Sequence, residues 1–419
     1  MIILPITVSA VGIFLLFKLS FFPIIHPVRT ARGLFRSVAD SGGYRSLSLA
    51  LAGTLGVGNV FGVAISITVG GAGSILWLLI SGVFSAMIKY AEALVSVDRM
   101  PRGGKQGGIM HAIESELPCG RVAGRIYASL CLVLALVMGG AMQSSAAVSS
   151  ARAVFADGGR IFSVSFAIIA LLLILSNRER LKSLTAYLIP FAAFCYALIC
   201  ISVIFRYASE LPSVLSEIFS NAFRPRSVGG GILGSLVASP VARGYSTGIL
   251  SNEAGAGTSS MAHASGEVAS PVGAGLLGMC EVIFDTSVIC TLSAFAILLP
   301  YGGSIPDISA SELVVSSLSR AFPHSELLLC ISVTAFALAT VVCWCFYGRV
   351  AVRYLFGGDK SGFFMPIYLA AVFVGSFIDC SPLAALSDVL LILLSFLCLP
   401  VIIKSSDRIR TLSERDGLI

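Results

Sequence analysis

Charged residues are scarce in this 419-residue chain, and their scarcity excludes most soluble architectures. Lysine, arginine, aspartate and glutamate together make up 12% of the residues, about half of the quarter that is usual in soluble proteins. Hydrophobic residues reach 56%, so too little polar surface is left to cover a core of this size in water. The composition excludes a soluble enzyme, a nucleic-acid-binding protein and a disordered chain, and it indicates a polytopic membrane protein.

Histidine is also rare, and the cysteines form no metal-binding or redox motif. The four histidines, His26, His111, His263 and His324, are scattered, and none of the 11 cysteines forms a C-x-x-C pair. Several cysteines lie inside apolar runs, where a thiol acts as a small hydrophobic group. Without the spacing of a zinc site or a disulfide framework, we expect no cofactor.

Long hydrophobic runs, in contrast, fill most of the chain. A helix needs about 20 apolar residues to cross about 30 Å of hydrocarbon. Eleven runs approach that length, near residues 2–24, 46–69, 74–97, 126–148, 161–177, 184–206, 231–263, 272–299, 327–348, 365–379 and 385–403. The chain is therefore predicted to be an all-α polytopic membrane protein with about 11 transmembrane helices.

The positive charges predict the orientation. If the N-terminus lies outside, most of the 28 lysines and arginines fall in cytoplasmic loops or in the C-terminal tail. This excess follows the positive-inside rule and predicts an outside N-terminus and a cytoplasmic C-terminus. The segment from Arg29 to Arg45 is predicted to be amphipathic and to lie on the cytoplasmic membrane surface. The expected location is a bacterial inner membrane.

Two of the hydrophobic runs are interrupted by glycines and polar residues. One contains Gly53-Thr-Leu-Gly-Val-Gly-Asn59, and the other contains Ser251-Asn-Glu-Ala-Gly-Ala-Gly-Thr258. Glycines alone would suit close helix packing. However, Asn59, Asn252 and Glu253 could not face lipid, and a broken backbone at membrane depth is tolerated where it lines a protein-enclosed cavity. Both runs are therefore predicted to be broken helices.

The positions of the two breaks indicate an inverted repeat. When the first run is set aside as an extra span, each broken helix opens a half of five helices, and an odd number gives the halves opposite topology. Paired glycine-interrupted segments of this kind point to a transporter with a midplane site. The expected parts are 1–45 (first span and amphipathic segment), 46–206 and 207–403 (the repeats), and 404–419 (a cytoplasmic tail).

The broken ends suit a small zwitterion. A half-helix beginning between Gly56 and Asn59 would point free N–H groups at a carboxylate. Carbonyls near Ala52 and Leu55 could coordinate a small cation, and carbonyls near residues 248–251 could receive an ammonium group.

These motifs resemble the alanine/glycine:cation symporter family, the sodium:alanine symporters. Ala52-Gly-Thr-Leu-Gly-Val-Gly-Asn-Val60 is similar to A-x-T-V-G-T-G-N-I, and Lys89-Tyr-Ala-Glu92 matches K-Y-A-E. Ser251-Asn-Glu-Ala-Gly-Ala-Gly257 resembles S-N-E-A-G-M-G, and further matches follow in order to about residue 357. The resemblance implies a leucine-transporter-like fold of inverted five-helix repeats with two broken helices, plus one extra N-terminal span.

The resemblance also implies roles for particular residues. The implied substrate site comprises Gly56, Val57, Gly58, Asn59, Gln143, Asn252, Glu253 and Gly255, and the implied sodium site comprises Ala52, Leu55 and Thr340. Five positions depart from the family pattern: Val57 replaces a threonine, Ser145 an asparagine, Thr247 an arginine, Ala339 a serine beside Thr340, and Arg349 a glutamate. The family's G-G-P-M-Y-Y motif is replaced by Gly107-Gly-Ile-Met-His-Ala112. These departures bear on the ion and the substrate and not on the fold.

Several ionisable residues lie within the hydrophobic runs. Glu253 is either a functional acid or an acid stabilised by the dipole at the start of the second half-helix. Glu281 and Asp285, four residues apart, need donors or protons, and hydrogen bonding is favoured over a proton relay. Lys89 and Glu92, three residues apart, are expected to form an ion pair.

The predicted function is import of a small neutral amino acid, alanine or glycine of L or D form, driven by sodium through alternating access. A proton-driven carrier of the same fold is the nearer alternative. An intramembrane enzyme would need a nucleophile and a base, or a metal constellation, and a channel would need continuous pore-lining rings. The expected partners are the amino acid, sodium and the bilayer, with no nucleic acid, and a monomer is expected.

Overall fold

The computed structural model describes residues 3–101, 107–155, 159–175, 178–223, 239–265, 268, 270–321, 325–358 and 361–419. Every regular element within these ranges is helical. His324 and residues 231–238 of the seventh predicted span lie outside the described residues. The all-α prediction therefore agrees with the structure over the part of the chain that can be compared.

The first part of the chain forms an N-terminal helix, three short helices and five core segments. Its elements are α1 (Ile3–Lys18), α2 (Phe22–Ile25), α3 (Pro27–Ala39), α4 (Ser41–Thr54), the π-helix η1 (Gly58–Gly62), α5 (Val63–Gly70), α6 (Ser74–Asp98), α7 (Ile109–Glu116), α8 (Gly120–Leu134), the π-helix η2 (Ala135–Met142), α9 (Gln143–Val154), α10 (Gly159–Ile174) and α11 (Arg178–Arg206).

The second part repeats the pattern of a broken helix followed by long helices. Its elements are η3 (Ala208–Glu210), α12 (Leu211–Ala222), α14 (Pro240–Asn252), α15 (Ser260–His263), α16 (Pro271–Val282), the π-helix η4 (Ile283–Cys290), α17 (Thr291–Leu298), η5 (Leu299–Tyr301), α18 (Ala310–Ala321), α19 (Ser325–Phe356), α20 (Ser361–Gly375), α21 (Cys380–Lys404) and α22 (Ser406–Arg415).

Six helices within the described ranges are long and apolar enough to cross a membrane, and a seventh span is added if α4 and the η1–α5 segment count as one. These two segments meet at a bend of 55°. The predicted spans near 161–177 and 365–379 appear as shorter apolar helices. The span predicted at 2–24 is wrong in its extent, because α1 ends at Lys18 and the backbone turns left-handed at Ser20 and Phe21.

Serine followed by proline sets the start of two helices in the second half. The Ser239 hydroxyl accepts a hydrogen bond from the amide of Ala242 at 3.2 Å, and Pro240 opens α14. The Ser270 hydroxyl accepts one from the amide of Gly273 at 2.9 Å, and Pro271 opens α16. Proline suits this place because the first amides of a helix have no partner within it. The two caps fix where α14 and α16 begin against α6.

Glycines allow α6 to pack closely between α14 and α16. A Cβ at Gly244 of α14 would lie 2.1 Å from the carbonyl oxygen of Ser74, and one at Gly278 of α16 would lie 2.7 Å from the carbonyl oxygen of Lys89. Side chains at these places would separate the helices, since small residues let helix backbones approach. The close packing brings side chains of α6 within reach of the second broken helix.

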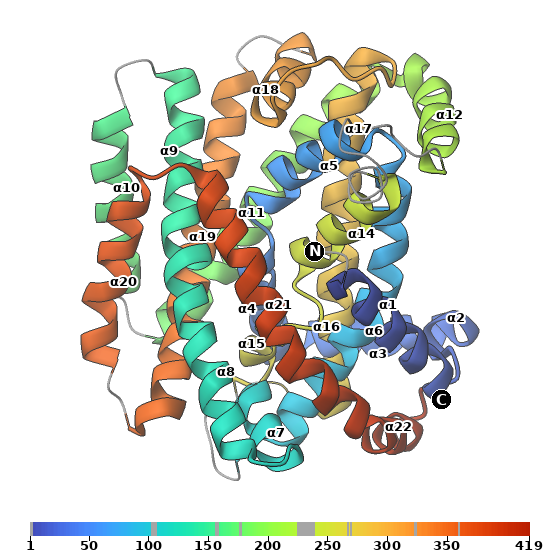
Figure 1. The fold of residues 1–419 in the computed structure, drawn as a ribbon, viewed down its shortest axis with the longest axis vertical. Helices are drawn as coiled ribbons and strands as arrows, with labels where there is room; N and C mark the ends of the chain where they lie inside the picture. The colour runs from blue at the N-terminus through green and yellow to red at the C-terminus, as the bar shows by residue number, and fades with distance from the viewer. Residues whose placement is uncertain are drawn as a thin grey trace.

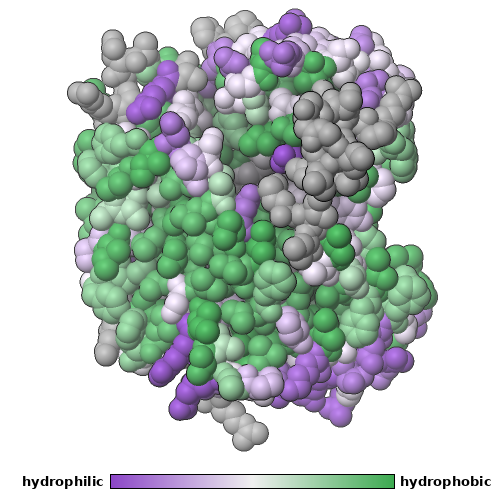
Figure 2. Space-filling model, in the orientation of Figure 1, coloured by the Kyte–Doolittle hydropathy of each residue, from purple (hydrophilic) through white to green (hydrophobic). Residues whose placement is uncertain are grey.

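The surface has the distribution of a protein surrounded by lipid. A broad apolar band crosses the middle of the visible face, and polar residues gather at both ends (Figure 2). Helices α12 and α18 lie at one end, and α7 and α22 lie at the other (Figure 1). The α4 half of the first broken helix extends toward the α7 end and the α5 half toward the α18 end (Figure 1). The break therefore lies near the middle of the apolar band.

Candidate functional site

The first break leaves two backbone amides without a hydrogen-bond acceptor in the described part of the chain. Residues 55–57 separate α4 from η1, and η1 continues directly into α5. The amide of Gly56 donates to Asn59 Oδ1 at 3.0 Å, whereas the amides of Val57 and Gly58 have no acceptor within the described ranges. A Cβ at Gly58 would meet no atom within 4 Å. Two amides without acceptors at the start of a helix can bind an anion.

Oxygen atoms gather on the other side of the same break. The Thr340 hydroxyl of α19 donates to the carbonyl of Leu55 at 3.3 Å and to that of Phe336 at 3.0 Å. The carbonyl of Ala52 has no hydrogen-bond donor in the part of the chain that the structure describes. Carbonyls at the end of a half-helix, together with a hydroxyl, are ligands that suit a small cation such as sodium.

Gln143 lies at the same point as Gly56 and Thr340. A Cβ at Gly56 would be 3.4 Å from Gln143 Oε1 and 3.4 Å from Thr340 Oγ1. The Gln143 side chain is buried and donates to the carbonyl of Met138 at 3.2 Å. Its Oε1 has no partner within the described ranges. This residue, on the third core helix, therefore brings a buried unpaired acceptor to the first break.

The two breaks are joined through Asp285. Asn59 Nδ2 donates to Asp285 Oδ1 at 2.7 Å and to Ser251 Oγ at 3.2 Å. Ser251 donates to Asp285 Oδ2 at 2.9 Å, and Thr286 donates to the same oxygen at 3.0 Å. Asn252 in turn donates to Thr286 Oγ1 at 3.0 Å. Asp285 thus has donors from both breaks, in agreement with the hydrogen-bonding role that was favoured.

Ser251 and Thr286 were not among the predicted site residues. Ser251 opens the S-N-E-A-G segment, and Thr286 follows directly after Asp285. Hydroxyl groups occur throughout the hydrophobic runs, so their positions in the sequence alone did not distinguish them. The usable signal was their adjacency to Asn252 and to the buried acid.

Glu253 does not lie at the start of a helix, and the dipole explanation for it is therefore wrong. It caps the C-terminal end of α14 in a left-handed conformation with φ of 53°, whereas α15 begins at Ser260. The C-terminal end of a helix disfavours an anion. Its Oε2 accepts a hydrogen bond from Thr258, and its Oε1 has no partner within the described ranges.

Two of the predicted site residues, Gly255 and Val57, are packed against other parts of the protein. A Cβ at Gly255 would lie 3.3 Å from Leu399 of α21 and 3.3 Å from Val8 of α1, so this face of Gly255 is turned toward those helices. The Val57 side chain is buried, with 3% of its surface exposed. The structure therefore brings Gly56, Gln143 and Thr340 together at the first break, and it does not add Gly255 to them.

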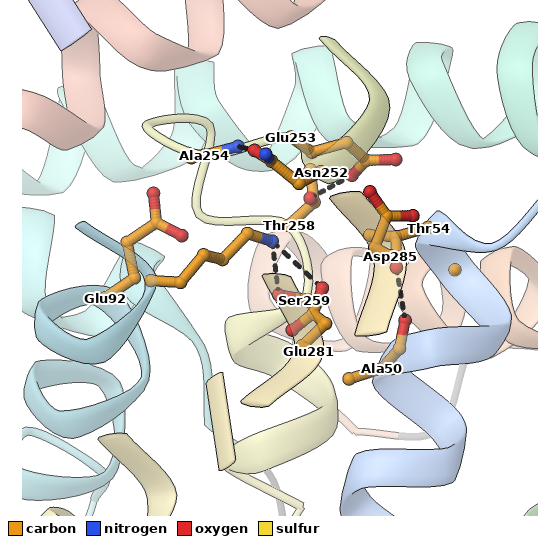
Figure 3. A network of polar contacts seen from close by, with 12 residues as sticks. Ala50, Thr54, Glu92, Asn252, Glu253, Ala254, Thr258, Ser259, Glu281 and Asp285 are labelled. Carbon is orange, nitrogen blue, oxygen red and sulfur yellow. Dashed lines mark hydrogen bonds and ion pairs between the residues drawn. The ribbon is translucent and has the colours of Figure 1, made fainter. Parts of the chain in front are cut away.

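The ion pair expected between Lys89 and Glu92 does not form. Lys89 Nζ lies 3.1 Å from Glu281 Oε1 and donates to Ser259 Oγ at 2.7 Å. Glu92 Oε1 instead accepts hydrogen bonds from the amides of Gly255 and Gly257, at 2.6 and 3.1 Å. Figure 3 shows Glu281 beside Ser259 and Glu92 apart from both. The close approach of α6 to α16 places Glu281 within reach of Lys89.

Two interrupted helices, each followed by long helices and meeting through a shared polar cluster, define a multi-spanning membrane transporter with the leucine-transporter-like inverted repeat. The chain belongs to the sodium:alanine symporter family, whose profile matches residues 1–413. Among its relatives, the sodium/alanine symporter AgcS of Methanococcus maripaludis is 28% identical over 381 residues, which cover 87% of this chain and 83% of that protein.

A second relative and a solved structure extend the comparison. The sodium/proton-dependent alanine carrier protein of Bacillus sp. (strain PS3) is 26% identical over 375 residues, which cover 84% of this chain and 83% of that protein. A crystal structure of a mutant of the Eremococcus coleocola manganese transporter shares the fold, with a TM-score of 0.58 at 14% identity, covering 86% of this chain and 78% of that one. The predicted family and fold class are thus confirmed.

Proposed function

We propose that this transporter imports a small neutral amino acid, alanine or glycine, together with sodium by alternating access. The observation that carries the proposal is the first break, where the free amides of Val57 and Gly58 lie beside the oxygens of Leu55 and Thr340. An anion site next to a cation site suits the carboxylate of an amino acid and a sodium ion, because each charge stabilises the other. The family to which the chain belongs supports the same pairing.

Each part of the substrate has a proposed partner. The substrate carboxylate accepts from the amides of Val57 and Gly58, and sodium is held by the carbonyls of Ala52 and Leu55 and by Thr340. The carbonyls near residues 248–251, at the end of α14, receive the ammonium group. Alternating opening of the two ends then carries both solutes across a bacterial inner membrane, with the N-terminus outside and the C-terminus in the cytoplasm.

Proton coupling is the second candidate, and one observation favours it. Glu92 and Glu253 are each 1% exposed, and each has one carboxylate oxygen without a hydrogen-bond partner within the described ranges. A buried carboxylate must be paired, hydrogen-bonded or protonated. In a proton-driven carrier, one of these acids would bind the coupling proton.

Uptake into vesicles separates the two candidates. Purified protein is reconstituted into liposomes, and accumulation of radiolabelled alanine and glycine is followed under an inward sodium gradient. Parallel vesicles have sodium replaced by choline or lithium, or carry an inward proton gradient without sodium. We expect accumulation with sodium alone. Accumulation under the proton gradient without sodium would instead establish the proton-driven carrier, and consumption of substrate without exchange would establish an enzyme.

Orientation is tested separately. Accessibility of a C-terminal tag in intact cells and in inverted membrane vesicles should show the tag only in the inverted vesicles. A tag that is accessible in intact cells would reverse the proposed orientation without affecting the proposed substrate.

A further inference from the structure

The backbone of the second break has the geometry of an anion-binding nest. Glu253, Gly255 and Gly257 have φ values of 53°, 94° and 74°, so left-handed residues occur at every second position. Left-handed residues in a short segment can direct several backbone N–H groups toward one point, where they bind an anion. In this chain the anion is supplied by the protein itself, since Glu92 Oε1 accepts from both Gly255 and Gly257.

The other amides of this segment also have protein acceptors. The amide of Ala254 donates to Asn252 Oδ1 at 3.0 Å, and the amide of Ala256 donates to the carbonyl of Glu253 at 3.2 Å. No amide from residue 254 to residue 257 is therefore left for a substrate. This differs from the first break, where the amides of Val57 and Gly58 are free.

Lys89 connects this filled nest to neighbouring helices. It donates to Ser259 Oγ at the end of the unwound segment and pairs with Glu281 of α16. His263 of α15 lies 3.3 Å from Glu281 Oε2 and is hydrogen-bonded to Ser46 Oγ of α4 at 3.0 Å. A chain of polar contacts thus joins the second break to α6, α16 and the α4 half of the first broken helix.

Further groups enclose Glu92. The thiol of Cys398 on α21 lies 3.7 Å from Glu92 Oε1, and the Tyr127 hydroxyl of α8 donates to the carbonyl of Ala256 at 2.7 Å. Glu92 is 1% exposed, so no solvent competes with the amides for its oxygen. A charged acceptor in such surroundings binds N–H donors more strongly than a neutral one does.

We propose that Glu92 is a positioning residue for amino-acid binding: its carboxylate is the built-in anion of the second break and holds the unwound segment in the shape that places Ser251 and Asn252 at the substrate. This inference rests on the proposed function. Glu92 acts through the backbone and does not contact the substrate. Figure 3 shows it on α6, apart from Asn252 and Asp285.

Two substitutions separate the charge of Glu92 from its hydrogen bonds. Glu92→Gln keeps an oxygen acceptor and removes the charge, and because charge-assisted hydrogen bonds are about twice as strong as neutral ones, the Kd for alanine and glycine should rise about tenfold. Glu92→Ala removes the acceptor and should raise Kd further. Formate, which fits the vacated nest, should restore part of the affinity of Glu92→Ala. Glu114→Gln, an acid of α7 outside the cluster, is the matched control and should bind as the wild type does.

Binding is measured by calorimetry on purified protein in sodium, and thermal unfolding is measured without substrate. A wild-type Kd in Glu92→Gln, with or without a lower unfolding temperature, would show that Glu92 acts on stability alone and would overturn the inference. If Glu92→Ala does not fold, Glu92→Gln decides. Failure of the wild type to bind either amino acid would refute the proposed function instead, which keeps the two failures distinguishable.

Discussion

A side chain at Gly58 should abolish amino-acid binding and leave folding intact. The φ of Gly58 is not positive, and an added Cβ would meet no protein atom within 4 Å, so we expect Gly58→Val to fold. It would fill the space beside the free amides of Val57 and Gly58. A hydrogen bond to a charged group contributes about 1.5–3 kcal/mol. Loss of two such bonds to the carboxylate costs about 3 kcal/mol or more, which raises Kd about 150-fold.

Two other glycines provide the controls. Gly62→Ala lies one turn further along η1, where its Cβ would be 3.8 Å from Thr247, an ordinary contact, and it should bind normally. Gly139→Ala would place its Cβ 2.1 Å from the Cβ of Trp344, and such overpacking costs about 1–3 kcal/mol of stability or more. Calorimetry gives Kd, and thermal unfolding gives stability. Normal affinity in purified Gly58→Val would refute the assignment of the first break as the carboxylate site.

Three further outcomes are expected. Thr340→Ala should raise the sodium concentration for half-maximal uptake with little loss of protein, and an unchanged sodium titration at fixed substrate would contradict its role as a ligand. Glu253→Gln should weaken uptake but leave it dependent on sodium, and exchange without accumulation in vesicles would show that Glu253 carries a coupling proton. Arg408→Ala breaks the paired contacts of its guanidinium with Asp98, at 2.7 and 3.2 Å. Since the Arg408 side chain is 45% exposed, the loss should be about 1 kcal/mol or less. A decrease in transport larger than the decrease in thermal stability would contradict a purely local role.

The fold was predictable from the sequence because the lipid environment leaves few alternatives. A backbone in hydrocarbon must satisfy its own hydrogen bonds, so long apolar runs had to be helices. Glycines beside Asn59 and Asn252 marked where those helices break. The length of α1 was not predictable, since its end depends on left-handed backbone at Ser20 and Phe21, and neither residue type favours that conformation.

The candidate site was predictable only where local sequence determines it. The free amides of Val57 and Gly58 were predictable, because the glycines that break the helix lie in the same seven residues, 53–59. The partners of Lys89 and Glu92 were not predictable, because they depend on which face of α6 meets α16 and the unwound segment. Spacing along one helix suggested that the two residues pair with each other. The glycine-mediated packing of α6 instead gives each a partner far away in the sequence.

The two breaks of the inverted repeat differ in whether an acid of the protein fills their amides. Glu92 lies on α6, the helix that follows the first break, and its carboxylate takes the amides of the second. Asp285 lies on the helix that follows the second break, and its carboxylate faces the first. However, Asp285 binds the side chain of Asn59, and Asn59 takes the amide of Gly56 alone. Glu92 thus accepts directly from the amides of the second break, whereas Asp285 leaves two amides of the first break without an acceptor. Because the Asn59 side chain lies between Asp285 and the backbone, the amides of Val57 and Gly58 stay free at the first break, whereas Glu92 occupies those of Gly255 and Gly257 at the second.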